Sequence, residues 1–158
     1  MIYDRAGAPS SASLARPWSE RSLLLSTRPR VLVADDYPDI VKSVSRLLAL
    51  DCEVLGSVTD GTALLETVQR LRPDVIVLDV HLPNVHTLEA CREMTRVNPA
   101  MKVIMFTAVD EPIVHQAFVE AGASAVVSKL AASDLPGIIK RLCDGRTDAH
   151  GPDSTGPP

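Results

Sequence analysis

The chain has 158 residues, of which 46% are hydrophobic and 23% are charged, and its net charge is −4. This length and composition predict one globular domain with a sizeable core. The acidic balance gives no electrostatic basis for binding nucleic acid. No run is long or apolar enough to span a bilayer or to act as a signal peptide. We therefore expect a cytoplasmic protein that makes no membrane contact.

The three cysteines, Cys52, Cys91 and Cys143, are widely spaced and odd in number. They fit neither a disulfide framework nor a zinc-ligand pattern. Cys52 and Cys91 fall in apolar periodic segments, so we interpret both as small core residues.

Composition predicts two tails around one folded segment. Residues 1–29 are rich in Ser, Ala, Arg and Pro without a sustained period, which predicts a flexible N-terminal arm. Residues 144–158 are rich in Gly, Pro and Asp, which predicts a disordered C-terminal tail without a helix-turn-helix. The fold is therefore expected within residues 30–143.

Between the tails, short apolar runs typical of buried strands alternate with segments in which apolar residues recur at helical spacing. The expected elements are, in chain order, strand 30–34, helix 40–50, strand 52–58, helix 62–71, strand 74–78, helix 88–97, strand 101–106, helix 113–121, strand 123–127 and a last helix capped by Ser133.

Five strands alternating with five helices predict an α/β fold, a doubly wound five-stranded parallel sheet with helices on both faces. The near-continuous apolar runs suit strands that are covered on both sides. We expect the flavodoxin-like strand order 2-1-3-4-5, with the switch point between the first and third strands.

Polar side chains stand where four of these strands end. VLVA ends at Asp35-Asp36, VIVL at Asp79, VIMF at Thr107 and AVVS at Lys129. The carboxyl ends of parallel strands share one edge of the sheet, where ligands bind in open α/β folds. Clustered carboxylates favour a cation, and oxygen ligands favour Mg²⁺. A carboxylate there can act as nucleophile toward a phosphoryl group, with the ammonium and hydroxyl stabilising its charge.

The chain resembles the receiver domain of two-component response regulators. The matching stretches are VLVADDYPDIVKSVSRLL, PDVIVLDVHLPNVHTLEA, VIMFTA and AGASAVVSKL, and the resemblance covers residues 30–143. It implies that Asp79 is the phosphoacceptor. It also implies that Asp36 and Asp79 bind Mg²⁺ directly with the backbone carbonyl of His81, while Asp35 acts mainly through a bound water.

The resemblance also implies roles for the other two strand-end residues. Lys129 pairs with Asp79 and then with its phosphate, and Thr107 swings to hydrogen-bond the phosphate and start a conformational switch. The expected function is that of a single-domain response regulator, not an enzyme. It accepts phosphate from a sensor histidine kinase or a phosphotransfer protein and acts on an unknown downstream protein, without binding nucleic acid through its own domain. Helix 113–121, strand 123–127 and the last helix form the expected partner or homodimer surface.

Three positions depart from the family pattern. Val126 stands where an aromatic residue usually couples to the threonine, and Leu130 replaces a common proline. Thr87 stands where a glycine usually precedes the helix, and it could cap that helix instead. His81 occupies a position that in the family tunes phosphorylation and hydrolysis rates, although an ordinary loop histidine fits the sequence equally well.

Other functions compete with the phosphorylated switch. Val126 and Thr87 motivate a phosphorylation-independent interaction module that keeps the receiver fold. A haloacid-dehalogenase-like phosphatase also uses a strand-end Asp, but it needs a second Asp where this chain has His81. An N-terminal remnant of a DNA-binding regulator is a further alternative. A transition-metal site from His81, His86 and Asp79 lacks a recognisable ligand spacing.

Overall fold

The structure is a computed structural model that describes residues 28–145, so most of the predicted arm and tail lies outside the described residues. Its core is one parallel sheet in the order β2-β1-β3-β4-β5, which confirms the predicted flavodoxin-like fold. The strands are β1 (Arg30–Ala34), β2 (Glu53–Val58), β3 (Val75–Asp79), β4 (Lys102–Thr107) and β5 (Ala125–Ser128).

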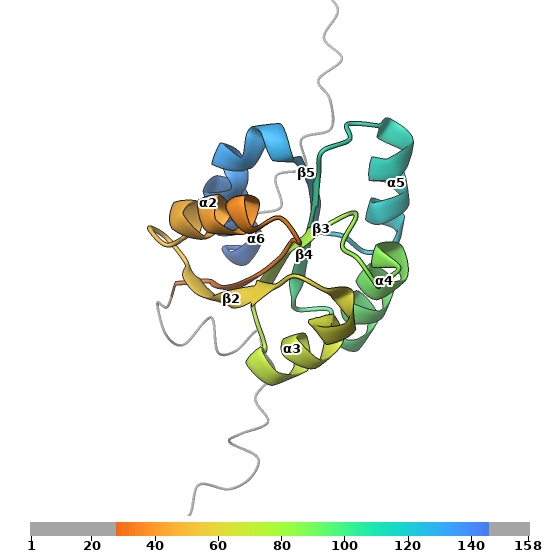
Figure 1. Cartoon of the computed structure of the whole chain (residues 1–158), viewed down its shortest axis with the longest axis horizontal. Coiled ribbons are helices and arrows are strands. Elements are labelled where there is room, and N and C mark those ends of the chain that lie inside the picture. Colours follow the sequence, from red (N-terminus) through yellow and green to blue (C-terminus); the bar gives the residue numbers. More distant parts are fainter. Residues whose placement is uncertain (1–27, 146–158) are drawn as a thin grey trace, which may run out of the picture.

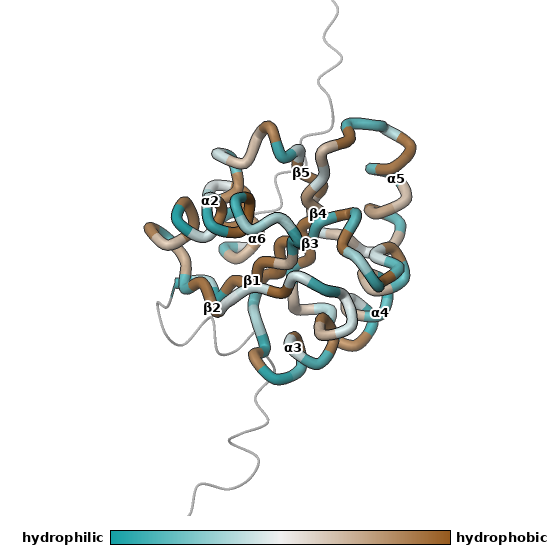
Figure 2. The backbone as a smooth tube through the Cα atoms, viewed as in Figure 1, coloured by the Kyte–Doolittle hydropathy of each residue, from teal (hydrophilic) through white to brown (hydrophobic). Residues whose placement is uncertain are grey.

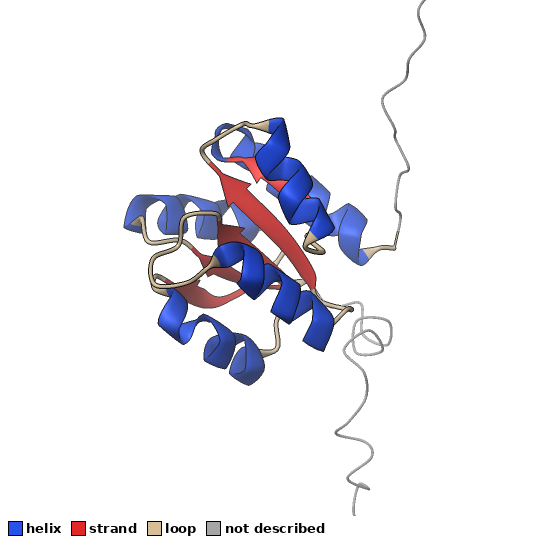
Figure 3. Cartoon of the chain, turned by 90° about the vertical axis from the view of Figure 1, so that its right-hand side faces the viewer, coloured by secondary structure: helices blue, strands red, loops and turns tan. Residues whose placement is uncertain are grey.

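Helices connect these strands and cover both sides of the sheet (Figures 1 and 3). They are α2 (Pro38–Leu48), α3 (Leu64–Leu71), α4 (Thr87–Val97), α5 (Pro112–Glu120) and α6 (Leu135–Cys143), with short 3-10 segments η2 (Gly61–Ala63) and η3 (Lys129–Asp134). None of the helices within residues 28–145 is long and apolar enough to cross a membrane.

Two hydrophobic cores lie on opposite faces of the sheet, because successive strand side chains point to opposite sides. Helices α2 and α6 pack over one face, where Val31 and Val33 of β1 join the core. Helices α3, α4 and α5 pack over the other face, which includes Leu32 and Ala34. The central strands are apolar along most of their length (Figure 2). Both faces being covered explains the near-continuous apolar runs in the sequence.

Two of the predicted helices are preceded by 3-10 segments that the sequence did not indicate. The second predicted helix begins as the 3-10 segment η2, where the Asp60 carboxylate accepts a hydrogen bond from the Thr62 amide at 2.8 Å. Ser133 does not cap the last helix. The chain first winds through η3, which Ser128 caps by accepting from the Leu130 amide, and α6 begins only after Asp134. The apolar periodicity located both helices but not the tighter turns in front of them.

The cysteines occupy the places that their apolar surroundings suggested. Cys52 and Cys91 are buried, while Cys143 is half-buried. Burial raises the pKa of the Cys91 thiol to about 11, so this side chain stays protonated near neutral pH. Cys52 and Cys91 therefore act as core residues.

The loop between β3 and α4 is tied to the start of η2. The Gly61 amide donates to the Pro83 carbonyl at 2.8 Å, and the Asn84 side-chain amide donates to the Asp60 carboxylate. Asn84 has a φ of 59°, so it supplies the left-handed residue of this loop. A Cβ on Gly61 would lie 2.2 Å from the Cβ of Val85. Glycine is required at position 61 because the two backbones approach so closely.

This close approach can be tested by two glycine substitutions that should change the free energy of unfolding in opposite directions. We expect Gly61→Ala to lower the free energy of unfolding by about 1–3 kcal/mol, because the added methyl group must displace Val85. The matched control is Gly137→Ala in α6, where a Cβ meets only Arg141 Nη1 at 3.9 Å. That change should raise the free energy of unfolding by about 0.5–1 kcal/mol through helix propensity. Urea unfolding measures both, and a Gly61→Ala chain as stable as the unsubstituted one would contradict the packing described.

Candidate functional site

The three predicted acidic residues meet where β1 and β3 end. These strands are neighbours, and Ala34 pairs with Leu78, so the next residues along each strand, Asp35 and Asp79, come side by side. One ligand oxygen from each of Asp35, Asp36 and Asp79 lies within 4.8 Å of the other two. Asp35 and Asp79 are only 1% and 4% exposed, whereas Asp36 faces solvent. Strand topology alone therefore assembles a cluster of oxygen ligands.

Lys129 reaches this cluster from the edge strand β5, which is separated from β3 by β4. It follows β5 directly, and its Nζ lies 2.6 Å from Asp35 Oδ2 and 3.4 Å from Asp79 Oδ1. The resemblance implied a pairing with Asp79, and the geometry adds a shorter contact with Asp35. One ammonium is thus shared by two buried carboxylates.

The pKa values of Asp79 and Lys129 are both shifted by burial and by the charged groups beside them. Burial raises the pKa of Asp79, and the neighbouring charge of Asp35 raises it further. The His81 amide, which donates to Asp79 Oδ1 at 3.2 Å, and the Lys129 ammonium oppose that rise only in part. Burial lowers the pKa of Lys129, but the hydrogen bond to Asp35 and the charge of Asp79 outweigh it, so the net shift is upward. Lys129 stays charged, while the carboxylates retain an excess of negative charge that a cation would relieve.

Thr107 ends β4 and is fully buried, but its hydroxyl is engaged within its own loop. The Oγ1 atom accepts a hydrogen bond from the Val109 amide at 2.9 Å and lies 3.1 Å from the Val109 carbonyl. Among the hydrogen bonds of residues 28–145, none joins this hydroxyl to the acidic cluster. The structure therefore places Thr107 at the correct strand end with its hydroxyl held by Val109.

Thr87 does not cap α4 as the sequence suggested. His86 holds the N-cap position, and Thr87 is the first helical residue, with its hydroxyl donating to the Val80 carbonyl at 2.6 Å. The left-handed backbone that a glycine would favour is found at Asn84 instead. Thr87 thus ties α4 to the residue that follows β3.

Within residues 28–145, no converging group of three metal-ligating side chains contains His81 or His86, so the alternative transition-metal site does not form.

Two aromatic rings that the sequence did not indicate lie beside Lys129. The Nζ atom lies 5.7 Å from the ring centroid of Tyr37 and 5.7 Å from that of Phe106. Tyr37 directly follows the acid pair and Phe106 directly precedes Thr107. Their adjacency to site residues was the only available indication, since a ring's direction depends on the folded backbone.

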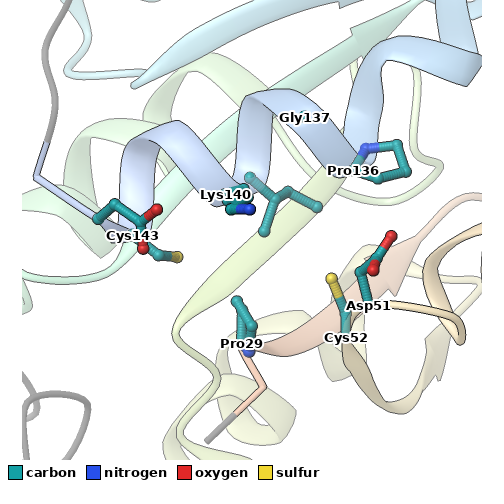
Figure 4. A pocket seen from close by; sticks show the side chains of 9 residues that line it. Pro29, Asp51, Cys52, Pro136, Gly137, Lys140 and Cys143 are labelled. Carbon is teal, nitrogen blue, oxygen red and sulfur yellow. The ribbon is translucent and has the colours of Figure 1, made fainter. Parts of the chain in front are cut away.

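A separate pocket of about 460 Å³ lies where β1 and β2 begin, at the opposite end of these strands (Figure 4). Residues of α6 form one wall, and Pro29, Asp51 and Cys52 line the other. Burial raises the pKa of Cys143 in this pocket to about 11 and also raises that of Cys52, so neither thiol is activated as a nucleophile. The acidic cluster remains the candidate functional site.

Comparison with known proteins identifies the family. The sequence profile of the response regulator receiver domain matches residues 31–140. The chain belongs to the response regulator receiver family. The receiver domain of NarL from Mycobacterium tuberculosis is 27% identical and superimposes with a TM-score of 0.71, covering 76% of this chain and 99% of that one.

Curated relatives of this receiver domain are longer proteins. The response regulator GacA of Pseudomonas viridiflava is 34% identical over 102 residues, which cover 63% of this chain and 48% of GacA. A protein-glutamate methylesterase/protein-glutamine glutaminase of Myxococcus xanthus is 30% identical over 142 residues, which cover 82% of this chain and 40% of that protein. The chain thus spans about half the length of the curated relatives it matches, or less.

Receiver domains bind Mg²⁺ at an acidic pocket, and Asp35, Asp36 and Asp79 provide such a pocket here. Three carboxylates and one ammonium leave a net negative charge, and all the ligand atoms are oxygen, which suits this hard cation. Receiver domains also interact with histidine kinases or phosphotransfer proteins.

Metal binding at this pocket should stabilise the fold. At Mg²⁺ one hundred times above its Kd, we expect the free energy of unfolding to rise by about 2.7 kcal/mol. Asp36→Asn should abolish most of this gain, because it removes the exposed ligand of the cluster. Glu66→Gln, an exposed acid on α3, is the control and should retain it. Thermal unfolding at constant ionic strength measures the effect, and equal gains in the two variants would exclude Asp36 as a ligand.

Proposed function

We propose that this receiver domain is a phosphorylatable switch in which Asp79 accepts a phosphoryl group from a histidine kinase or a phosphotransfer protein. The observation that supports it most is the setting of Asp79 at the open end of the sheet. This carboxylate lies 3.4 Å from the Lys129 ammonium and within 4.8 Å of ligand oxygens of two other carboxylates. A nucleophilic oxygen, a counter-charge and cation ligands thus stand together, as phosphoryl transfer requires.

The proposed transfer proceeds on the Asp79 side chain. A carboxylate oxygen attacks phosphorus, the bond from phosphorus to the donor's imidazole nitrogen breaks, and the electron pair leaves on that nitrogen. Mg²⁺, held by Asp36, Asp79 and the His81 carbonyl, with Asp35 acting through water, would neutralise charge on the phosphoryl oxygens. Lys129 would follow the phosphoryl group with its ammonium.

The proposed switch begins at Thr107. To hydrogen-bond a phosphoryl oxygen, its hydroxyl must leave Val109. At present the hydroxyl accepts from the Val109 amide and donates to the Val109 carbonyl. Val126, half-buried against the core, pairs with Met105 of the adjacent strand and offers less bulk than an aromatic residue. We infer that any movement passes through the Val109 loop toward α5 rather than through a ring at position 126.

The surface formed by α5, β5 and α6 is the proposed docking face for an unknown downstream protein or a second copy. Ile113 and Val119 of α5 and Leu130 of η3 are exposed apolar side chains. Exposed apolar side chains on and between these elements suit a protein contact. We propose action as a single domain in the cytoplasm, with no enzymatic activity beyond gain and loss of its own phosphoryl group.

The phosphorylated switch can be tested directly. We expect the chain, incubated with phosphoramidate and Mg²⁺, to gain one phosphoryl group that hydroxylamine removes, since the product is an acyl phosphate. Asp79→Asn should gain none, while Asp39→Asn, an acid in the first turn of α2, should gain it normally. Intact-protein mass spectrometry gives the result. Absence of the group in the unsubstituted chain under every donor would favour the phosphorylation-independent interaction module.

A further inference from the structure

Two aromatic rings and two carboxylates surround the ammonium of Lys129. The Nζ atom is 5.7 Å from each of the ring centroids of Tyr37 and Phe106. Both distances lie within the roughly 6 Å at which a cation is attracted to a ring face. The same atom donates to Asp35 at 2.6 Å and lies 3.4 Å from Asp79. The ammonium therefore lies within attractive range of two rings as well as of its two anionic partners.

The two rings are held in different ways. Phe106 is 1% exposed and lies in β4, in register with Asp79, so the core fixes its ring. Tyr37 is 64% exposed and precedes α2. Its amide donates to Asp35 Oδ1 at 2.9 Å, and Pro38 after it favours the observed extended backbone. A turn built on a pocket carboxylate, and not core packing, therefore places the Tyr37 ring.

We propose that Tyr37 is a positioning residue for phosphoryl transfer, which it serves by holding the Lys129 ammonium beside Asp79. This inference rests on the proposed role of Asp79 as phosphoacceptor. A lysine ammonium sits on a flexible four-carbon stem, so its location depends on the groups around it. Of the two rings that the ammonium contacts, Tyr37 is the solvent-exposed one and Phe106 the buried one.

Positioning has a kinetic consequence that other roles of the ring lack. Transfer to Asp79 and hydrolysis of its phosphate both place charge on the phosphoryl oxygens that Lys129 faces. Loss of a positioning ring therefore slows both steps by a similar factor and leaves steady-state occupancy unchanged. A ring that only excluded water would, when removed, speed hydrolysis alone. A ring that only blocked donors would, when removed, speed transfer alone.

Three substitutions at Tyr37 separate these roles. Tyr37→Phe keeps the ring, Tyr37→Leu keeps apolar bulk without a π face, and Tyr37→Ala removes both. With the full chain, Mg²⁺ and saturating phosphoramidate, we expect Tyr37→Phe to match the unsubstituted chain. Tyr37→Leu and Tyr37→Ala should slow transfer and phosphate loss together by about two- to fivefold, the range expected for one exposed cation–π contact. Unchanged rates in Tyr37→Leu, or a change in only one step, would overturn the proposal.

A second measurement does not depend on phosphorylation. Nitrogen-15 NMR should show faster solvent exchange of the Lys129 ammonium protons in Tyr37→Leu and Tyr37→Ala than in Tyr37→Phe, while thermal unfolding shows all three folded. Equal exchange in the three variants would refute the positioning role even if Asp79 were never phosphorylated. If the unsubstituted chain takes up no phosphoryl group but the exchange differs as expected, the proposed function fails while the Tyr37–Lys129 contact stands.

Discussion

The sharing of one lysine ammonium between two buried carboxylates is the interaction on which this pocket depends. Lys129 Nζ contacts Asp35 at 2.6 Å and Asp79 at 3.4 Å, and both carboxylates are almost fully buried. A buried carboxylate without a counter-charge is strongly disfavoured, so the Lys129 ammonium offsets part of the desolvation penalty of Asp35 and Asp79. With Asp36 also present, one positive charge faces three negative ones. The remaining negative charge favours a divalent cation, which together with Lys129 would offset the negative charge of a phosphoryl group.

The sheet topology brings these groups together from distant parts of the chain. Asp35 and Lys129 are 94 residues apart in the sequence, yet they form a direct contact because β1 and β5 end at the same edge. Hydrophobic packing on both faces of the sheet holds the strand ends in register. Packing elsewhere in the fold therefore compensates for the repulsion among these carboxylates, as is common at functional sites.

Sequence patterns were sufficient to predict the strand order and the edge at which the polar residues gather. Strand ends are set by apolar runs, and parallel pairing then aligns Asp35 with Asp79 without further information. Side-chain directions were not predictable in the same way, because they depend on neighbours that are remote in sequence. The preference of Lys129 for Asp35, the engagement of the Thr107 hydroxyl by Val109 and the Tyr37 ring over Lys129 all emerged only from the folded structure. Thr87 and Ser133 were misassigned because local capping preferences were overridden by a tertiary hydrogen bond in one case and by the 3-10 segment η3 in the other.

Titration with beryllofluoride, which resembles a phosphoryl group on a carboxylate, tests most directly whether the cluster around Asp79 is a phosphoryl pocket. In two-dimensional amide NMR with Mg²⁺ present, the amide signals of Asp79, Lys129 and the Thr107–Val109 turn should shift. These shifts should saturate at one bound beryllofluoride per chain. They should be absent without Mg²⁺ and in Asp79→Asn. Spectra of the unsubstituted chain that do not change at saturating beryllofluoride and Mg²⁺ would contradict the assignment of this cluster as a phosphoryl pocket.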